Sequence, residues 1–209
     1  PRGPRRWVAA SVCAEADAAL AEDCRARGVP GPELFGRDLP VPIPVLVRRP
    51  ERTGVDRLLC ALGARAAVGA PSIVVGAGTA ITVDLVDEEG RFAGGAIAPG
   101  FALAARALHE GTSALPHVEP ARPEAAVGLD TEEAIRSGVW AFCRGGVHEL
   151  ICRFAEGCET APVVVLAGGD ADLIVAKGQY NYDTLYGTQL PPAYFAFRPV
   201  CVCMAKHLG

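Results

Sequence analysis

Hydrophobic residues along the chain fall into short runs and into longer stretches with helical spacing, and the two patterns predict alternating strands and helices. Three short apolar runs follow one another from Ser72 to Gly100, separated by a glycine-rich turn at 76–79 and an acidic turn at 87–90. Short apolar runs bounded by turn residues are typical of strands, so this segment predicts a three-stranded meander. Helical spacing predicts helices at Ala14–Arg27, Thr53–Ala67, Gly100–Gly111 and Thr131–Ala155, the last with Thr131 as its N-cap.

The remaining stretches predict shorter elements. Strands are expected at Arg6–Val12, Glu33–Phe35 and Ala161–Ala167, a short helix at Ala171–Ala176, and a loop with one late strand from Lys177 onward. The order from Ile73 is three strands, two helices, a strand and a helix, which matches a ribonuclease-H-like half. The strand–helix–strand–helix before it looks like the back portion of a second such half without its own meander. We therefore predict an α/β, ribonuclease-H-like (actin-like ATPase) fold of two similar halves, with a truncated first half at 1–70 and the second at 71–209.

Composition and charge narrow the class of protein. Half of the 209 residues are hydrophobic and 21% are charged, which is typical of a packed globular chain. A net charge of -4 argues against a general nucleic-acid or membrane-surface binder, and no apolar run approaches the roughly 20 residues that span a bilayer. The N-terminal segment has no long apolar stretch of the kind found in secretory signals.

The eight cysteines show no zinc-like spacing. Cys201 and Cys203 fall on one face of a possible strand, where two small core residues are a simpler interpretation than a thiol pair or a metal site. Reduced thiols in the cytosol explain the pattern most simply.

Several residues carry candidate chemistry, each with an ordinary structural alternative. The turn Gly76-Ala77-Gly78-Thr79 presents backbone N–H groups and a hydroxyl to a possible phosphate, although a plain hairpin turn looks the same. Asp56 is either a general base or a helix-start carboxylate that pairs with Arg57. Arg57 is suited to a carboxylate or phosphate, but could equally be an exposed arginine.

Other polar residues are less informative. Asp84 faces either inward or toward solvent, and the acidic run at 87–89 is expected to be a solvated turn. His109 and His117 have no partner at a catalytic or metal-binding spacing and are expected to be surface or connector residues.

A series of motifs in one order gives a more specific indication. The segments are PERTGVDR (50–57), GTAITVD (78–84), GGAIAPG (94–100), TSALP (112–116), GLDT (128–131) leading to Gly138-Val139, and LAGGD (166–170). Each is weak alone, but together they closely resemble the type III pantothenate kinase family of the acetate and sugar kinase/Hsp70/actin superfamily.

The resemblance implies a cytoplasmic phosphotransferase of coenzyme A biosynthesis. Members transfer the γ-phosphoryl group of ATP to pantothenate, require Mg²⁺ and a monovalent cation (K⁺ or NH₄⁺), and are usually homodimers. By resemblance, Asp56 is the general base. The substrate contacts are Gly54, Val55, Asp56, Arg57 and Thr131, and the nucleotide contacts are Gly78, Thr79, Gly168 and Gly169.

The sequence departs from the family pattern in three places. It contains no DxGNT phosphate motif, and Gly76 stands where the family has its cation-binding Asp. The third departure is the tail after Leu173, which lacks the expected apolar closing helix, and Val47 also stands near the position expected for an aromatic substrate contact. The alternative interpretation is therefore a catalytically impaired homologue with a regulatory or ligand-binding role.

Overall fold

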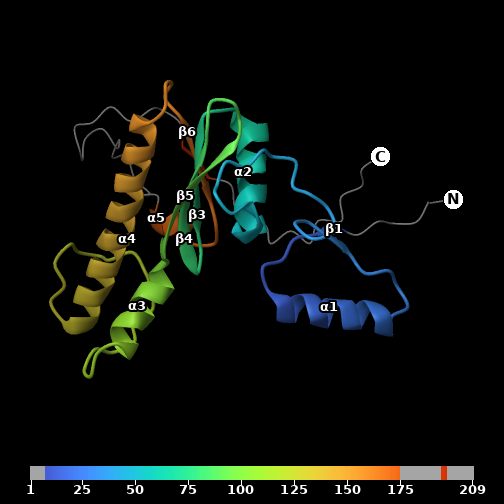
Figure 1. Cartoon of the computed structure of the whole chain (residues 1–209). Helices are drawn as coiled ribbons and strands as arrows, with labels where there is room; N and C mark the ends of the chain where they lie inside the picture. Colours follow the sequence, from blue (N-terminus) through green and yellow to red (C-terminus); the bar gives the residue numbers. More distant parts are fainter. Residues whose placement is uncertain (1–7, 175–193, 197–209) are drawn as a thin grey trace.

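A mixed five-stranded sheet forms the centre of the molecule in this computed structural model, which describes residues 8–174 and 194–196. The strand order is β5-β4-β3-β6-β7 (Figure 1). The strands are β3 (Ser72–Ala77), β4 (Ala80–Val86), β5 (Phe92–Pro99), β6 (Val163–Ala167) and β7 (Tyr194–Ala196). Strands β3, β4 and β5 pair antiparallel, while β6 pairs parallel with both β3 and β7. The meander, the buried strand and the late strand are therefore confirmed, whereas the Cys201–Cys203 pair lies outside the described residues.

The helices lie where the apolar spacing predicts them, within two residues at most ends. They are α1 (Ala14–Ala26), α2 (Val55–Val68), α3 (Phe101–Glu110), α4 (Thr131–Glu156) and α5 (Ala171–Ile174), with a 3-10 turn at Pro50–Arg52. The described part of α5 ends at Ile174, and the last two residues of the predicted Ala171–Ala176 helix lie outside the described residues.

The predicted N-cap of α4 is wrong by one residue. The Asp130 carboxylate accepts a hydrogen bond from the backbone N–H of Glu133 at 2.8 Å, so Asp130 is the cap and Thr131 is the first helical residue. The Glu133 carboxylate in turn accepts from the backbone N–H of Leu129 at 2.8 Å. This reciprocal arrangement resembles a capping box and satisfies donors that the helix itself leaves free.

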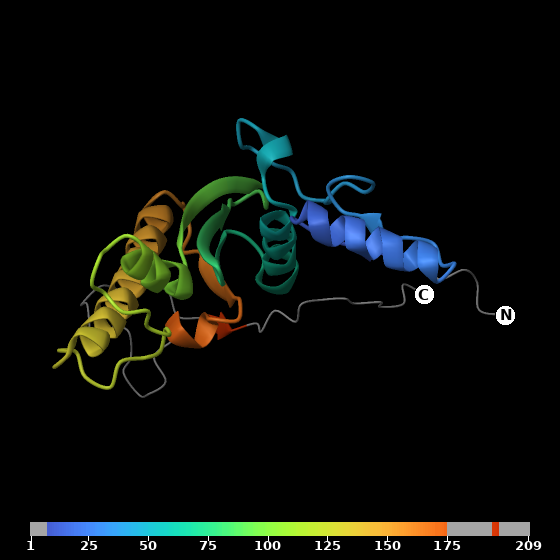
Figure 2. The ribbon, with the colours of Figure 1, turned by 90° about the horizontal axis from the view of Figure 1, so that it is seen from below.

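Two hydrophobic cores lie on opposite faces of the sheet, because successive residues of a strand alternate between faces. Ile73, Val75 and Val83 point toward α3 and α4, where they join Phe101 and Val139. On the other face, helix α2 contributes Ala61 and Ala64 to a second core, which also contains Val74, Val86, Phe92 and Val165. Figures 1 and 2 show α3 and α4 on one side of the sheet and α2 on the other.

The N-terminal part of the described chain forms a small separate unit. Strand β1 (Val8–Ala9) pairs parallel with β2 (Glu33–Leu34), and α1 connects them. Only Cys24 of α1 is buried, and the helix projects away from the main sheet (Figure 2). The following segment joins the sheet at its edge, where Phe92 donates its N–H to Pro44 at 2.8 Å and Leu46 donates to Phe92 at 2.9 Å.

The starts of α2, α3 and α5 gather at one end of the strands, the edge of the sheet where β3, β5 and β6 terminate. Strands β3, β5 and β6 all run toward this edge, since β3 is parallel to β6 and antiparallel pairing through β4 aligns β5 with β3. Helix α2 runs the opposite way, because a short turn at 69–71 connects its end to the beginning of β3. The carboxyl ends of parallel strands are the usual location of ligand sites in α/β proteins, and the predicted site residues of α2, the hairpin turn and the 168–170 loop all lie here (Figure 1).

The backbone of Gly168 predicts a strong position-specific effect on stability. Its φ is +117°, and a Cβ atom would collide with the backbone of Ala77. We expect Gly168→Ala to lower the free energy of unfolding by about 2 kcal/mol or more, measured by urea denaturation. Gly169→Ala is the matched control, because no atom lies within 4 Å of a Cβ built there. A similar loss in both variants would contradict this account.

Candidate active site

The hairpin turn between β3 and β4 is held by the beginning of α3. The N–H of Gly100 donates to the carbonyl of Thr79 at 3.0 Å, and a side chain at position 100 would collide with the carbonyl of Gly78. The side chain of Thr79 is exposed. The turn therefore presents an exposed hydroxyl from a backbone whose position is fixed by the start of α3.

The Gly168-Gly169 loop lies directly against the end of β3. The absence of a side chain at Gly168 lets its backbone approach Ala77, and the N–H of Asp170 donates to the Ala77 carbonyl at 3.2 Å. Since Ala77 immediately precedes Gly78, the structure brings the two predicted nucleotide-binding segments together.

A cleft of about 440 Å³ opens beside this turn. Gly78, Thr79 and Asp170 line it from the sheet edge, and Arg106 of α3 lines it from the side. The connector between α3 and α4 supplies further polar lining. The cleft thus combines backbone, hydroxyl and cationic groups, which are the groups that bind phosphates.

Arg106 lines the cleft and was not singled out by the sequence, whereas His117, expected to be a surface or connector residue, is an exposed connector residue that also lines it. His117 lies 3.8 Å from the Glu119 carboxylate, and its ring contacts that of His109 edge-on with centroids 5.9 Å apart. The position of Arg106 in the second turn of the helix that follows Gly100 is the only signal that could have suggested it. No sequence pattern indicates that His117 lines the cleft, since the connector has no helical or strand periodicity.

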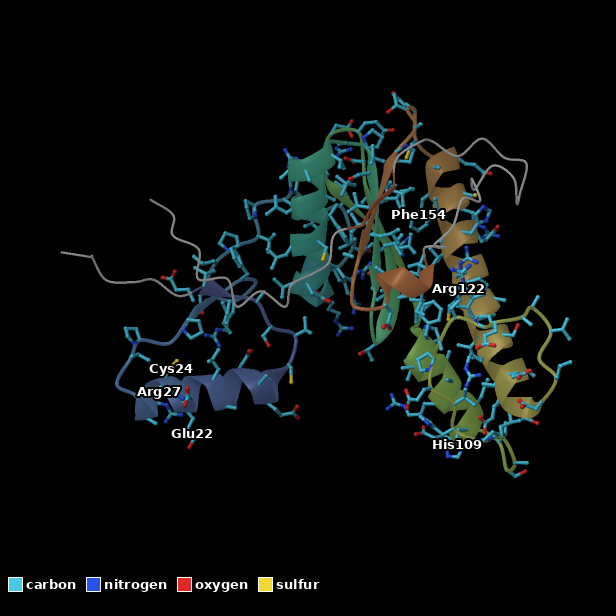
Figure 3. The ribbon with its side chains drawn as sticks, turned by 180° about the vertical axis from the view of Figure 1, so that it is seen from behind. Glu22, Cys24, Arg27, His109, Arg122 and Phe154 are labelled. Atoms are coloured by element: carbon cyan, nitrogen blue, oxygen red, sulfur yellow. The ribbon has the colours of Figure 1, made fainter. Side chains whose placement is uncertain are left out.

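The connector is fixed to α4 rather than hanging free. The guanidinium of Arg122 lies 6.0 Å from the ring centroid of Trp140, and the Ser137 hydroxyl donates to the Ala126 carbonyl at 2.6 Å. Figure 3 shows Arg122 beside α4 and His109 on α3. These contacts hold the segment that carries His117 at the border of the cleft.

Asp56 occupies the first turn of α2 and is exposed. Its carboxylate folds back over Gly54, where a Cβ atom would collide with it. Within the described part of the chain, the carboxylate has no hydrogen-bond or ion-pair partner. An exposed carboxylate without a partner remains free to accept a proton, as a general base must.

Arg57 pairs with Asp84 rather than with Asp56, so the helix-start alternative does not form an Asp56–Arg57 pair. Its Nε donates to both carboxylate oxygens of Asp84, at 3.0 and 3.2 Å, and its Nη2 also donates to Oδ1. The guanidinium lies over the ring of Phe92, 5.5 Å from the centroid. Arg57 is thus mostly buried, not an exposed surface residue.

The orientation of Asp84, which the sequence left open, is inward. The residue is 1% exposed. Burial raises the pKa of the Asp84 carboxyl, and hydrogen bonds from Arg57 and Thr82 act in the opposite direction. Gly95, directly opposite on β5, leaves room for the carboxylate, because a Cβ atom at Gly95 would collide with it.

The acidic turn is only partly solvated, which corrects the prediction for 87–89. Asp87 is 8% exposed, and its carboxylate accepts hydrogen bonds from the backbone and side chain of Arg91, both at 2.8 Å. Glu88 accepts from the backbone N–H of Glu159 at 2.7 Å. The turn lies at the opposite end of the strands from the cleft. Its contacts therefore stabilise the local chain and are not part of the candidate site.

Gly76 pairs with Thr82 across β3 and β4, on the sheet face that carries Asp84. A Cβ atom at Gly76 would lie 2.7 Å from the Thr82 hydroxyl. The residues that the structure describes contain no group of three or more His, Cys, Asp or Glu side chains able to hold a metal ion. Gly76 therefore offers no side-chain oxygen to K⁺.

Thr131 is separated from Asp56 by the sheet. It is exposed at the start of α4, whereas Asp56 begins α2 on the other face (Figures 1 and 2). Gly54, Val55, Asp56 and Arg57 are adjacent in one helix start, but a single copy of the chain does not bring Thr131 to them.

Known proteins resemble this chain in both fold and sequence. A Campylobacter jejuni protein assigned to the Baf family of transcriptional activators has a similar structure, with a TM-score of 0.52 and 18% identity over 83% of this chain and 72% of that one. The two proteins therefore share an α/β fold with a mixed sheet.

Sequence comparison identifies the family. The model of the type III pantothenate kinase family matches residues 2–153. The type III pantothenate kinase of Gluconobacter oxydans is 43% identical over 143 residues, covering 68% of this chain and 53% of the relative. That of Nocardia farcinica is 44% identical over 141 residues, covering 66% and 53%. The chain belongs to the type III pantothenate kinase family and spans about half the length of these curated relatives.

The buried ion pair predicts a pH-dependent loss of stability when its cation is removed. Arg57→Leu should lower the free energy of unfolding near pH 7 by about 3–5 kcal/mol, because Asp84 would remain as an unpaired buried charge. Without Arg57, burial alone raises the folded-state pKa of Asp84 above its unfolded value of about 3.9. The penalty is therefore smallest below that unfolded value and grows as the pH rises through it. Urea denaturation of both proteins at pH values from about 3.5 to 7 measures this loss of unfolding free energy.

Arg153→Leu is the control, because the Arg153–Glu149 pair is exposed, with side-chain exposures of 70% and 59%. Its loss should stay near or below about 1 kcal/mol. Equal losses in the two variants at every pH would contradict the buried-pair account.

Proposed function

We propose that this chain carries pantothenate kinase activity, the transfer of the γ-phosphoryl group of ATP to pantothenate that gives 4'-phosphopantothenate in coenzyme A biosynthesis. The observation that carries the proposal is a grouping at the carboxyl end of β3. It consists of the Asp56 carboxylate, which has no partner among the described residues, Arg57, which pairs with buried Asp84, and a polar cleft beside the Gly78-Thr79 turn. Family membership supports the same activity. We place it in the cytoplasm, as expected for the family.

Phosphoryl transfer asks the protein mainly to position its reactants and to stabilise charge. We assign the nucleotide to the cleft, with Gly78 and Thr79 at its phosphates and the Gly168-Gly169 loop close to its adenosine. Glu119 and Asp170 line the same cleft and offer the carboxylate oxygens that Mg²⁺ prefers. ATP supplies the transferred group when bound.

The acceptor site is assigned to the start of α2. Asp56 takes the proton of the pantothenate hydroxyl, a role for which position matters more than basicity in a loose transition state. Arg57 binds the pantothenate carboxylate, and the backbone of Gly54 and Val55 contacts the substrate. Gly76 has no side chain to bind a monovalent cation, so we expect the activity not to depend on one.

The sheet topology supports the finer fold assignment. An antiparallel meander followed by two parallel strands, in the order β5-β4-β3-β6-β7, is the arrangement expected of a ribonuclease-H-like half. We propose that this sheet belongs to the second half of an actin-like ATPase fold, with residues 1–70 part of the first half.

The competing proposal is a homologue that binds ligands without efficient turnover. Gly76 is the observation that favours it, since a lost cation ligand would weaken charge stabilisation near the phosphates. The kinase assay below separates the two.

We further propose that the chain forms a homodimer through the outer face of α4. The exposed positions of this helix carry no charge over three turns: Ala134, Gly138, Ala141, Phe142, Gly145 and Gly146. Phe142 is 72% exposed, and Leu129, next to the helix start, is 91% exposed.

The glycines of α4 support this surface. Glycine inside a helix costs about 1 kcal/mol relative to alanine, and a Cβ atom at Gly138, Gly145 or Gly146 would meet no atom within 4 Å. Contacts within the chain therefore do not require them, whereas a flat surface lets a second helix approach closely. Such a dimer would also give Thr131 a route to the partner's acceptor site.

The proposed activity predicts ATP- and pantothenate-dependent turnover. With MgATP, we expect formation of 4'-phosphopantothenate at a rate that K⁺ or NH₄⁺ does not raise, because Gly76 provides no ligand for them. Asp56→Asn should lower kcat by about 100-fold or more with little change in the KM for ATP. A coupled ADP-release assay measures both.

Asp17→Asn is the matched control, since Asp17 also lies in the first turn of a helix but far from the cleft. It should leave kcat unchanged. Pantothenate binding without turnover in any cation would favour the impaired homologue, and unchanged turnover in Asp56→Asn would remove the base assignment.

The dimer proposal predicts a mass of twice 21.7 kDa by light scattering after size exclusion. Phe142→Glu should shift the protein to monomer, because a charge would then be buried in the contact. Val12→Glu serves as the control, since Val12 is also 70% exposed but lies outside α4. A monomeric parent protein, or a dimer unaffected by Phe142→Glu, would overturn this surface.

A further inference from the structure

Asp84 is a buried carboxylate that the proposed mechanism does not use directly. It lies in the middle of β4, is 1% exposed, and faces the start of α2. A buried charge is costly unless it is paired and hydrogen-bonded. Here the partner is Arg57, the residue next to the proposed base.

The pairing geometry uses one edge of the guanidinium. Asp84 accepts from Nε and from Nη2 of Arg57. A guanidinium carries five N–H donors in a rigid fork, so three remain: both on Nη1 and the second on Nη2. In the part of the chain that the structure describes, no further acceptor binds them, and the side chain keeps 16% of its surface exposed.

Two further contacts fix the orientation of this fork. The ring of Phe92 lies under the guanidinium at 5.5 Å. Gly95 leaves the space that the Asp84 carboxylate fills, since any Cβ there would collide with Oδ1. The arginine is thus held on one edge and one face, while its remaining donors are free to take a planar anion.

We propose that Asp84 is a positioning residue, which holds Arg57 so that its free donors bind the carboxylate of the acceptor substrate. This inference rests on the proposed function and deepens it. Asp84 contacts Arg57 and not the substrate, and it thereby selects an acceptor that carries a carboxylate over a neutral analogue of the same length.

The test compares pantothenate with panthenol, in which a neutral hydroxymethyl group replaces the carboxylate. Calorimetric titration of the full chain, in the presence of a non-hydrolysable ATP analogue, measures the affinity of each. We expect Asp84→Asn to weaken pantothenate binding by about tenfold or more while leaving the affinity for panthenol unchanged. A structural role alone would weaken both ligands equally.

Asp87→Asn is the matched control, since it makes the same chemical change in another Asp–Arg pair that lies away from the cleft. It should alter neither affinity. Thr82→Val is the second test variant, because it removes the hydroxyl that hydrogen-bonds Asp84 and keeps the Asp84 charge. It should reproduce the selective loss, and it keeps the test decisive where Asp84→Asn fails to fold.

The outcomes separate the inference from the kinase proposal. Equal weakening of both ligands, no weakening, or a parent protein that binds panthenol as tightly as pantothenate would overturn the role of Asp84, whatever the turnover. Selective loss in a protein that shows no phosphoryl transfer would support Asp84 and overturn the kinase activity.

Discussion

The close approach of chain segments around the end of β3 is the constraint on which the site depends. Strand β3 is the central strand, buried on both faces, and its last residue, Ala77, accepts a hydrogen bond from the 168–170 loop. That contact exists only because Gly168 has no side chain and adopts a positive φ. Gly100 plays the same part on the other side, where it lets α3 begin against the hairpin turn. Without these two glycines, the segments that border the cleft would be held apart.

Much of the fold could be predicted from the sequence, because its elements have strong local signals. The meander is bounded by glycine and acidic turns, and the four longer helices have clear apolar spacing, so both were confirmed. The cap of α4 was wrong because Asp130 and Thr131 are both good caps, and only the hydrogen bond to Glu133 decides between them. The solvated turn at 87–89 was partly wrong because the Arg91 contacts that bury Asp87 leave no pattern in the sequence.

The candidate site was predictable where it depends on contiguous motifs and not where it depends on folding. Gly78 and Gly168 lie in glycine-rich segments that the sequence itself singles out, and tertiary structure only brings them together. The Arg57–Asp84 pair joins residues 27 positions apart in sequence on a helix and a strand, so no local pattern indicates it. Arg106 and His117 border the cleft through the packing of α3 and its connector, which periodicity does not reveal.

The pairing of Gly76 with Thr82 links the cation position to the acceptor site. The Thr82 hydroxyl occupies the space beside Gly76 and also hydrogen-bonds Asp84, which in turn holds Arg57. A carboxylate introduced at position 76 would have to displace that hydroxyl, and so would loosen the contact that helps to fix the arginine. The residue at 76 is thus coupled to the acceptor site through the orientation of one hydroxyl, although neither Gly76 nor Thr82 contacts Arg57 itself in the hydrogen bonds described.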